Sequence, residues 1–117
     1  MVKTTTSIGK LGEEISIIFL KQKGFLILEK NFHSRFGEID IIAKKDKTFV
    51  FVEVKTRSSS MFGTPAESVT RSKLAKLIKT ADYYCFLHKC GLENMRFDVL
   101  EVFLPEKRVN HIENVTF

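Results

Sequence analysis

Two neighbouring apolar stretches of this sequence are interrupted by charged residues. The first stretch carries Glu38 and Asp40, and the second carries Glu53 and Lys55. Both stretches are rich in Ile, Val and Phe, which is typical of β-strands, and charged residues inside such strands need a reason. Carboxylate oxygens are the ligands that Mg²⁺ and Mn²⁺ prefer, so the pattern indicates a divalent-cation site with an ammonium group beside it.

The elements that must position these groups are the two strands of a predicted β-hairpin. Residues 36–43 and 49–57 would form the strands, with Asp46 and Lys47 as a two-residue loop between them. A longer loop with the same centre would keep the same facing residues. A slip of one residue would change every pair, because side chains alternate between the two faces of a strand.

In this register Asp40 faces Glu53, and Glu38 faces Lys55. Like charges directly opposed across two strands destabilise a sheet, so we expect the facing carboxylates to share a cation. The alternative is an ordinary cross-strand ion pair next to two carboxylates on a solvated face.

The other face of the hairpin favours the cation site, because it carries a complete apolar core face. Ile42 and Phe51, on the charged face, indicate that this face is partly covered as well. A half-covered face with clustered carboxylates is an active-site pattern. The expected core face consists of Ile39, Ile41, Ala43, Val50, Val52 and Val54.

A third carboxylate is expected from a helix predicted over residues 7–23. Gly9 and Ser16 are small residues on one flank of this helix, which would allow that flank to approach the sheet. Glu13 projects from the same flank, whereas Glu14 projects toward lysines and water. A buried carboxylate needs a partner, so Glu13 is expected to join the cation site. The alternative is that Glu13 is merely a residue at the helix edge.

The remaining elements are read from apolar periodicity, caps and turns. We expect a short turn at 65–69, a helix at 71–89, and strands at 25–30, 95–103 and 109–117. The order predicts an α/β fold in which a mixed central sheet of about five strands is flanked by helices, within one domain over residues 1–117. His33, in the loop before the hairpin, is expected to be solvated.

Charge and composition favour a polyanionic partner. The net charge is +5 with a pI near 9.3, and Arg57 and Lys73 lie near the acidic residues, so we expect contacts to nucleic acid. No apolar run approaches the ~20 residues of a membrane span. The first residues lack an apolar signal core, which predicts a cytoplasmic protein. Cys85 and Cys90 have poor zinc spacing and are expected to be free thiols.

Asp40 followed by Glu53-Val54-Lys55 resembles the D…(D/E)-x-K signature of the restriction-endonuclease-like superfamily. A longer pattern, from about residue 9 to the C-terminus, resembles the YraN-like family, which is bacterial, little characterised in function and related to Holliday-junction resolvases. Ser16, where that family usually has Ala, and the ending 115–117 depart from the pattern. The pattern comprises Gly9, Gly12-Glu13, Asn31, 37–43, 50–57, Gly63, Pro65, Val69, Lys73, 96–99, His111-Ile112 and Asn114.

This resemblance implies a restriction-endonuclease-like fold and a metal-dependent nuclease that hydrolyses phosphodiester bonds, with DNA, including structured or branched DNA, as the favoured substrate. Asp40, Glu53 and Glu13, with the carbonyl oxygen of Val54, would bind Mg²⁺ or Mn²⁺. Lys55 would orient the attacking water and offset charge in the transition state.

Three further residues are given supporting roles. Glu38 would hold Lys55 in place, and Arg57 and Lys73 would grip flanking phosphates. The alternative functions are a non-catalytic nucleic-acid-binding module and an accessory protein of DNA metabolism in which the hairpin charges are only structural. The substrate is open between duplex, single strand, branched junction and RNA, and junction cleavage would favour a homodimer.

Overall fold

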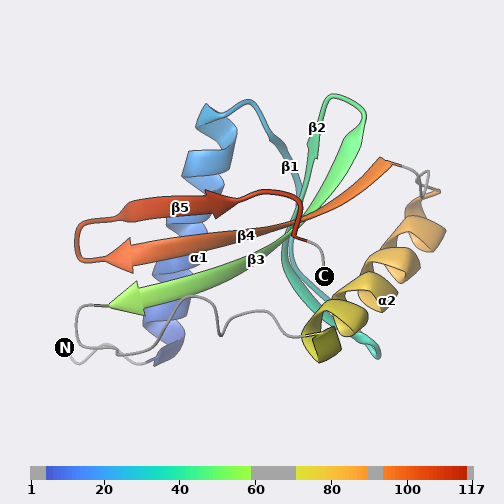
Figure 1. The fold of residues 1–117 in the computed structure, drawn as a ribbon, viewed down its shortest axis with the longest axis horizontal. Coiled ribbons are helices and arrows are strands. Elements are labelled where there is room, and N and C mark those ends of the chain that lie inside the picture. The colour runs from blue at the N-terminus through green and yellow to red at the C-terminus, as the bar shows by residue number, and fades with distance from the viewer. Residues whose placement is uncertain (1–4, 59–70, 90–93, 116–117) are drawn as a thin grey trace.

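The computed structural model describes residues 5–58, 71–89 and 94–115. In this part of the chain, one five-stranded sheet has the strand order β1-β2-β3-β4-β5. Strands β3 and β4 pair in parallel, and the other neighbours are antiparallel, which confirms the predicted mixed sheet (Figure 1). The elements are α1 Thr5–Gln22, β1 Leu26–Ser34, β2 Gly37–Lys45, β3 Thr48–Ser58, α2 Arg71–His88, β4 Met95–Leu104 and β5 Arg108–Ile112.

Two apolar clusters hold the helices against the sheet. Leu20 of α1 packs in one cluster, and Ala81, Tyr84 and Cys85 of α2 pack in the other. Figure 1 shows α1 crossing β3 and β4, and α2 beside β2. In the described residues, neither helix has the length and apolar content of a membrane-spanning segment.

The hairpin of β2 and β3 has the predicted register. Its pairs run from Lys45–Thr48 next to the turn up to Ile41–Val52. The turn consists of Asp46 and Lys47 as expected, and Asp46 has a φ of 55°, a left-handed conformation that Asp tolerates better than most residues.

Beyond the Ile41–Val52 pair the two strands separate, and we call this point the β2–β3 fork. Strand β3 continues beside β4 as far as the pair Ser58–Leu104. The expected facing pairs Asp40–Glu53 and Glu38–Lys55 are therefore absent from the described ladder.

The face assignment of the hairpin needs two corrections. Ile39 was expected beside Ile41, but it packs in the α2 cluster, because β2 has already left β3 at this point. Ile42 and Phe51 were expected to be partly covered, and they are fully buried in the same cluster.

Two strands differ in length from the expectation. Strand β1 extends to Ser34, because its last residues pair with the beginning of β2 in a second hairpin. Strand β5 ends at Ile112 rather than at residue 117, since the Asn114 backbone then turns to donate a hydrogen bond to the Asp98 side chain. The expected turn at 65–69 and Cys90 lie outside the described residues.

The flank of α1 with small residues lies on the sheet, as predicted. Gly12 is buried, and a Cβ atom at this position would clash with the side chain of Thr56 on β3. Ser16 is also buried, and its hydroxyl donates a hydrogen bond to the Gly12 carbonyl at 2.8 Å. This close approach places the first half of α1 beside the β2–β3 fork.

Candidate metal and nucleic-acid site

Asp40 lies at the β2–β3 fork and binds to the backbone of the separated strand. Its Oδ2 atom accepts a hydrogen bond of 2.8 Å from the backbone N–H of Val54. The ladder of β2 with β3 ends before Val54, so the Asp40 carboxylate takes the place of a backbone carbonyl as the acceptor. The fork thus fixes one carboxylate oxygen.

The charges of other carboxylates affect the pKa of Asp40. The pKa of Asp40 is raised from 3.8 to about 6. Burial is the main cause, the negative charges of Glu13, Glu53 and Glu38 add to it, and the hydrogen bond from Val54 opposes it. Repulsion of this kind requires proximity. Carboxylates from α1, β2 and β3 therefore lie near enough to act on the charge of Asp40, whereas their meeting at a shared cation stays a prediction.

Glu53 and Lys55 form a half-buried ion pair on β3. The Lys55 Nζ atom lies 3.3 Å from Glu53 Oε1, and the two side chains are 21% and 18% exposed. The other oxygen, Glu53 Oε2, is buried and has no hydrogen-bond partner among the residues that the structure describes. An unpaired buried carboxylate oxygen is costly, so this atom is an available position for a cation.

The α2 side of the site is basic. The neighbouring Lys55 amine, burial and the Lys55 charge lower the pKa of Lys73, while Glu53 opposes this shift and Arg57 adds to it. Lys73 also lines a hollow of about 250 Å³ with Gly37, Glu38, Glu53, Lys76 and Leu77. The two predicted phosphate-binding residues, Arg57 and Lys73, thus lie at the candidate site.

Glu38 does not hold Lys55, contrary to the prediction. It lies 3.1 Å from the Nδ1 atom of His33, and both side chains are exposed. The reason is the fork: β2 pairs with β1 at this level, where His33 faces Glu38, rather than with β3. His33 is accordingly in contact with Glu38, and not only a solvated side chain.

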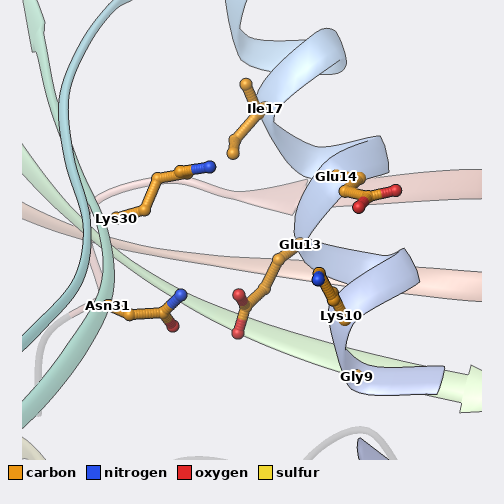
Figure 2. Close-up of a pocket in the computed structure, with 7 residues that line it drawn as sticks. All are labelled: Gly9, Lys10, Glu13, Glu14, Ile17, Lys30 and Asn31. Carbon is orange, nitrogen blue, oxygen red and sulfur yellow. The ribbon is translucent and has the colours of Figure 1, made fainter. Parts of the chain in front are cut away.

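Glu13 lines a separate hollow on the α1 side of the site. This hollow has a volume of about 410 Å³ and lies between α1 and β1. Figure 2 shows the Glu13 carboxylate pointing across it toward Asn31, whereas Glu14 points away. Glu13 thus points to the β1 side of α1, and its share in a cation site with Asp40 and Glu53 stays a prediction.

The carboxylates do not form a closed cluster. In residues 5–58, 71–89 and 94–115, no three His, Cys, Asp or Glu side chains are placed so that they could hold a metal ion. Asp40 is bound to Val54, and Glu53 is bound to Lys55.

Sequence reasoning assigned no role to Asp98, although the resemblance included it. Asp98 is buried and accepts two hydrogen bonds of 2.9 Å from Arg96, one of 2.9 Å from the Asn114 N–H, and a 2.7 Å contact with His111 Nε2. Burial opposes the effect, but the bonds from His111, Arg96 and Asn114 hold its pKa below the usual range. This cluster fastens the segment after β5 to β4.

Sequence reasoning also missed Glu101 on β4, which is only 1% exposed. Its Oε1 atom accepts a 2.8 Å hydrogen bond from Asn110, and its Oε2 atom is buried without a partner in the described part of the chain. Glu101 is the β4 neighbour of Lys55. The signal was an acidic residue between the apolar Val99 and Phe103, the same kind of interruption that marked the hairpin.

The fold and the site define an α/β protein with a mixed sheet whose carboxylates converge where two strands separate. Residues 12–102 match the model of the uncharacterised protein family UPF0102. The chain belongs to this family, which is the YraN-like family that the sequence resembles.

Relatives with UPF0102 names cover most of the chain. A UPF0102 protein of Clostridioides difficile (strain 630) is 49% identical over 106 residues, which are 91% of this chain and 93% of that protein. Another, of Syntrophomonas wolfei, is 42% identical over 109 residues, or 92% of this chain and 95% of that protein. A third, of Dictyoglomus thermophilum, is 45% identical over 99 residues, or 85% and 84%.

Proposed function

We propose that this protein is a metal-dependent nuclease that hydrolyses phosphodiester bonds of nucleic acid, with DNA as the favoured substrate. The observation that carries the proposal is the raised pKa of Asp40 together with its position at the β2–β3 fork. Carboxylates that repel one another in a half-buried site are poised for a cation. The mixed sheet with flanking helices is compatible with a restriction-endonuclease-like fold.

The proposed ligand is a hard divalent cation such as Mg²⁺ or Mn²⁺, for which carboxylate oxygens are the preferred donors. Glu53 offers a buried oxygen without a described partner, and Asp40 and Glu13 add carboxylates. The carbonyl oxygen of Val54 is a proposed fourth ligand. A bound cation would lower the pKa of a water molecule and offset charge on the phosphate oxygens.

Lys55 would provide the fixed positive charge of the site. Its ammonium lies 3.3 Å from Glu53, so it is held next to the proposed ligands. In this position it would hydrogen-bond the attacking water and stabilise developing negative charge. Because its amine is already engaged with Glu53, an electrostatic role suits Lys55 better than a general-base role.

Arg57 and Lys73 would bind phosphates on the α2 side. The charges of Arg57, Lys55 and Glu53 all act on Lys73, and the hollow that contains Lys73 also reaches Glu53. The net charge of +5 supports an anionic polymer as the partner. Such contacts position a nucleic-acid backbone without reading its sequence.

The test compares Asp40→Asn with Asp46→Asn, a matched exchange in the exposed turn of the same hairpin. Both proteins and the wild type are incubated with Mg²⁺ or Mn²⁺ and with duplex, single-stranded and branched DNA and RNA. We expect the wild type and Asp46→Asn to cleave at least one substrate, and Asp40→Asn to lose at least about a hundredfold in rate.

Lys55→Met, with Lys47→Met as its control, should show the same loss. Undiminished cleavage by Asp40→Asn and Lys55→Met would refute the assigned roles. Binding without cleavage, independent of divalent cations and of Asp40, would instead identify a non-catalytic nucleic-acid-binding protein.

A further inference from the structure

The hollow between α1 and β1 is lined by Glu13 and by further polar groups that the proposed chemistry does not use. Its volume is about 410 Å³, and it opens beside Glu13. Figure 2 shows Lys30 and Asn31 extending from β1 toward α1, with Lys10 on the facing side of the helix. The lining consists of Gly9, Lys10, Glu13, Glu14, Ile17, Lys30 and Asn31.

Asn31 has an unusual backbone for a strand residue. It lies within β1, but its φ is 52°, in the left-handed region. The pairs Lys30–Ile41 and Phe32–Ile39 flank it, so Asn31 lies beside Asp40 on the neighbouring strand. Left-handed residues inside strands are uncommon, and they cluster at functional sites.

The side chain of Asn31 is not used by the fold. It is exposed and makes no hydrogen bond to another residue of the described chain. Figure 2 shows its amide group directed into the hollow toward Glu13. A polar side chain that is directed into a hollow, and that satisfies nothing there, is available for a ligand.

We propose that this hollow binds a phosphate group of the nucleic-acid strand, adjacent to the phosphate that is cleaved, through the Asn31 amide and the Lys10 and Lys30 ammonium groups. The inference rests on the proposed function and adds a second phosphate contact on the α1 side of the carboxylates. The contacts of Arg57 and Lys73 lie on the α2 side, so the strand would cross the site at the β2–β3 fork.

The charges of the hollow suit this ligand. Two lysines, Lys10 and Lys30, line the hollow together with Glu13 and Glu14. The Glu14 carboxylate points away (Figure 2), and the proposed cation would offset the charge of Glu13. A phosphodiester carries one negative charge and two free oxygens, which accept hydrogen bonds from ammonium and amide groups. Ile17 provides an apolar wall for the sugar.

The competing explanation is that Asn31 is present only because it tolerates the left-handed backbone. Glycine adopts that conformation without strain, and Asp tolerates it better than most residues. Asn31→Gly therefore removes the amide while keeping the backbone, and Asn31→Asp replaces the NH₂ donor with a negative charge. Neither exchange should unfold the protein, and thermal unfolding of both variants checks this expectation.

The experiment measures binding of fluorescently labelled DNA by anisotropy, with Mg²⁺ present, in a Lys55→Met parent that does not cleave. We expect Asn31→Asp to weaken binding by about tenfold or more, and Asn31→Gly by a smaller factor. Lys30→Gln should lower the slope of log affinity against log salt by about one. Lys107→Gln, the same exchange in the exposed β4–β5 turn, should weaken binding less than Lys30→Gln.

Two outcomes would overturn the inference, and they differ. Binding by the parent that is unchanged in Asn31→Asp and Asn31→Gly would reject the phosphate site alone. Absence of any nucleic-acid binding by both the parent and the wild type would reject the proposed function as well.

Discussion

Asp40→Asn should stabilise the metal-free protein while it destroys the proposed activity. The wild-type carboxylate has a pKa of about 6 instead of 3.8, so the folded state holds this charge poorly. At neutral pH a difference of this size corresponds to about 3 kcal/mol. Asn has no charge, and its side-chain oxygen can still accept the hydrogen bond from Val54. Allowing for imperfect replacement, we expect a gain of about 1–3 kcal/mol in the free energy of unfolding.

The pH dependence of this gain identifies its cause. The folded protein keeps a proton on Asp40 up to about pH 6, whereas the unfolded chain releases it near 3.8. The Asp40 contribution to stability therefore falls as the pH rises through this window. The gain of Asp40→Asn should be small at pH 3.5, grow up to about pH 6 and then stay constant.

Urea unfolding at pH values from 3.5 to 8, without divalent ions, measures this difference directly. Asp46→Asn is the control, because Asp46 is exposed in the turn. Mg²⁺ should then stabilise the wild type more than Asp40→Asn, because ligands stabilise the state that binds them. A variant that is less stable than the wild type at pH 7.5 would show that the Asp40 charge is well accommodated, and the argument for a cation site would fail.

Three further predictions test the surroundings of the site. Gly12→Ala should destabilise the fold, because the added Cβ would clash with Thr56. Gly9→Ala is its control: a Cβ there meets nothing within 4 Å, so it should stabilise the helix by up to about 1 kcal/mol. Thermal unfolding of both variants measures the difference. Glu101→Gln should raise the unfolding temperature, because it removes a buried charge with one unpaired oxygen. Asp98→Asn should lower the free energy of unfolding by about 2–4 kcal/mol at pH 7, measured by urea unfolding. The lowered pKa of Asp98 stabilises the fold when the pH lies above the pKa of an unfolded aspartate, and this contribution is lost as the pH falls. The cost of the exchange should therefore be smaller below pH 4.

Much of the hairpin could be predicted because its signals are local. The alternation of side chains and the turn at Asp46 set the register of β2 with β3. The flank of α1 with Gly12 likewise predicted a close approach to the sheet. These features depend on neighbours in sequence, which a single chain displays.

The fork could not be predicted, because it depends on distant pairing. Strand β3 leaves β2 as it continues along β4, more than 40 residues later in the chain. For this reason the supposed Glu38–Lys55 contact was wrong, and so was the facing pair of Asp40 with Glu53. Glu101 was missed because its burial depends on the same strand pairing.

The two carboxylates with shifted pKa values show what distinguishes a site from a structural element in this sheet. Asp98 is buried among donors, namely Arg96, His111 and the Asn114 N–H, and its pKa is lowered. Among the residues that the structure describes, Asp40 has one donor, the Val54 N–H, and burial together with neighbouring negative charges raises its pKa.

This chain therefore can satisfy a buried carboxylate, and it does so at Asp98. If Asp40 served the fold alone, a similar set of donors would be expected around it. In the proposed site a divalent cation would supply positive charge next to Asp40, and Lys55, 3.3 Å from Glu53, would supply a second.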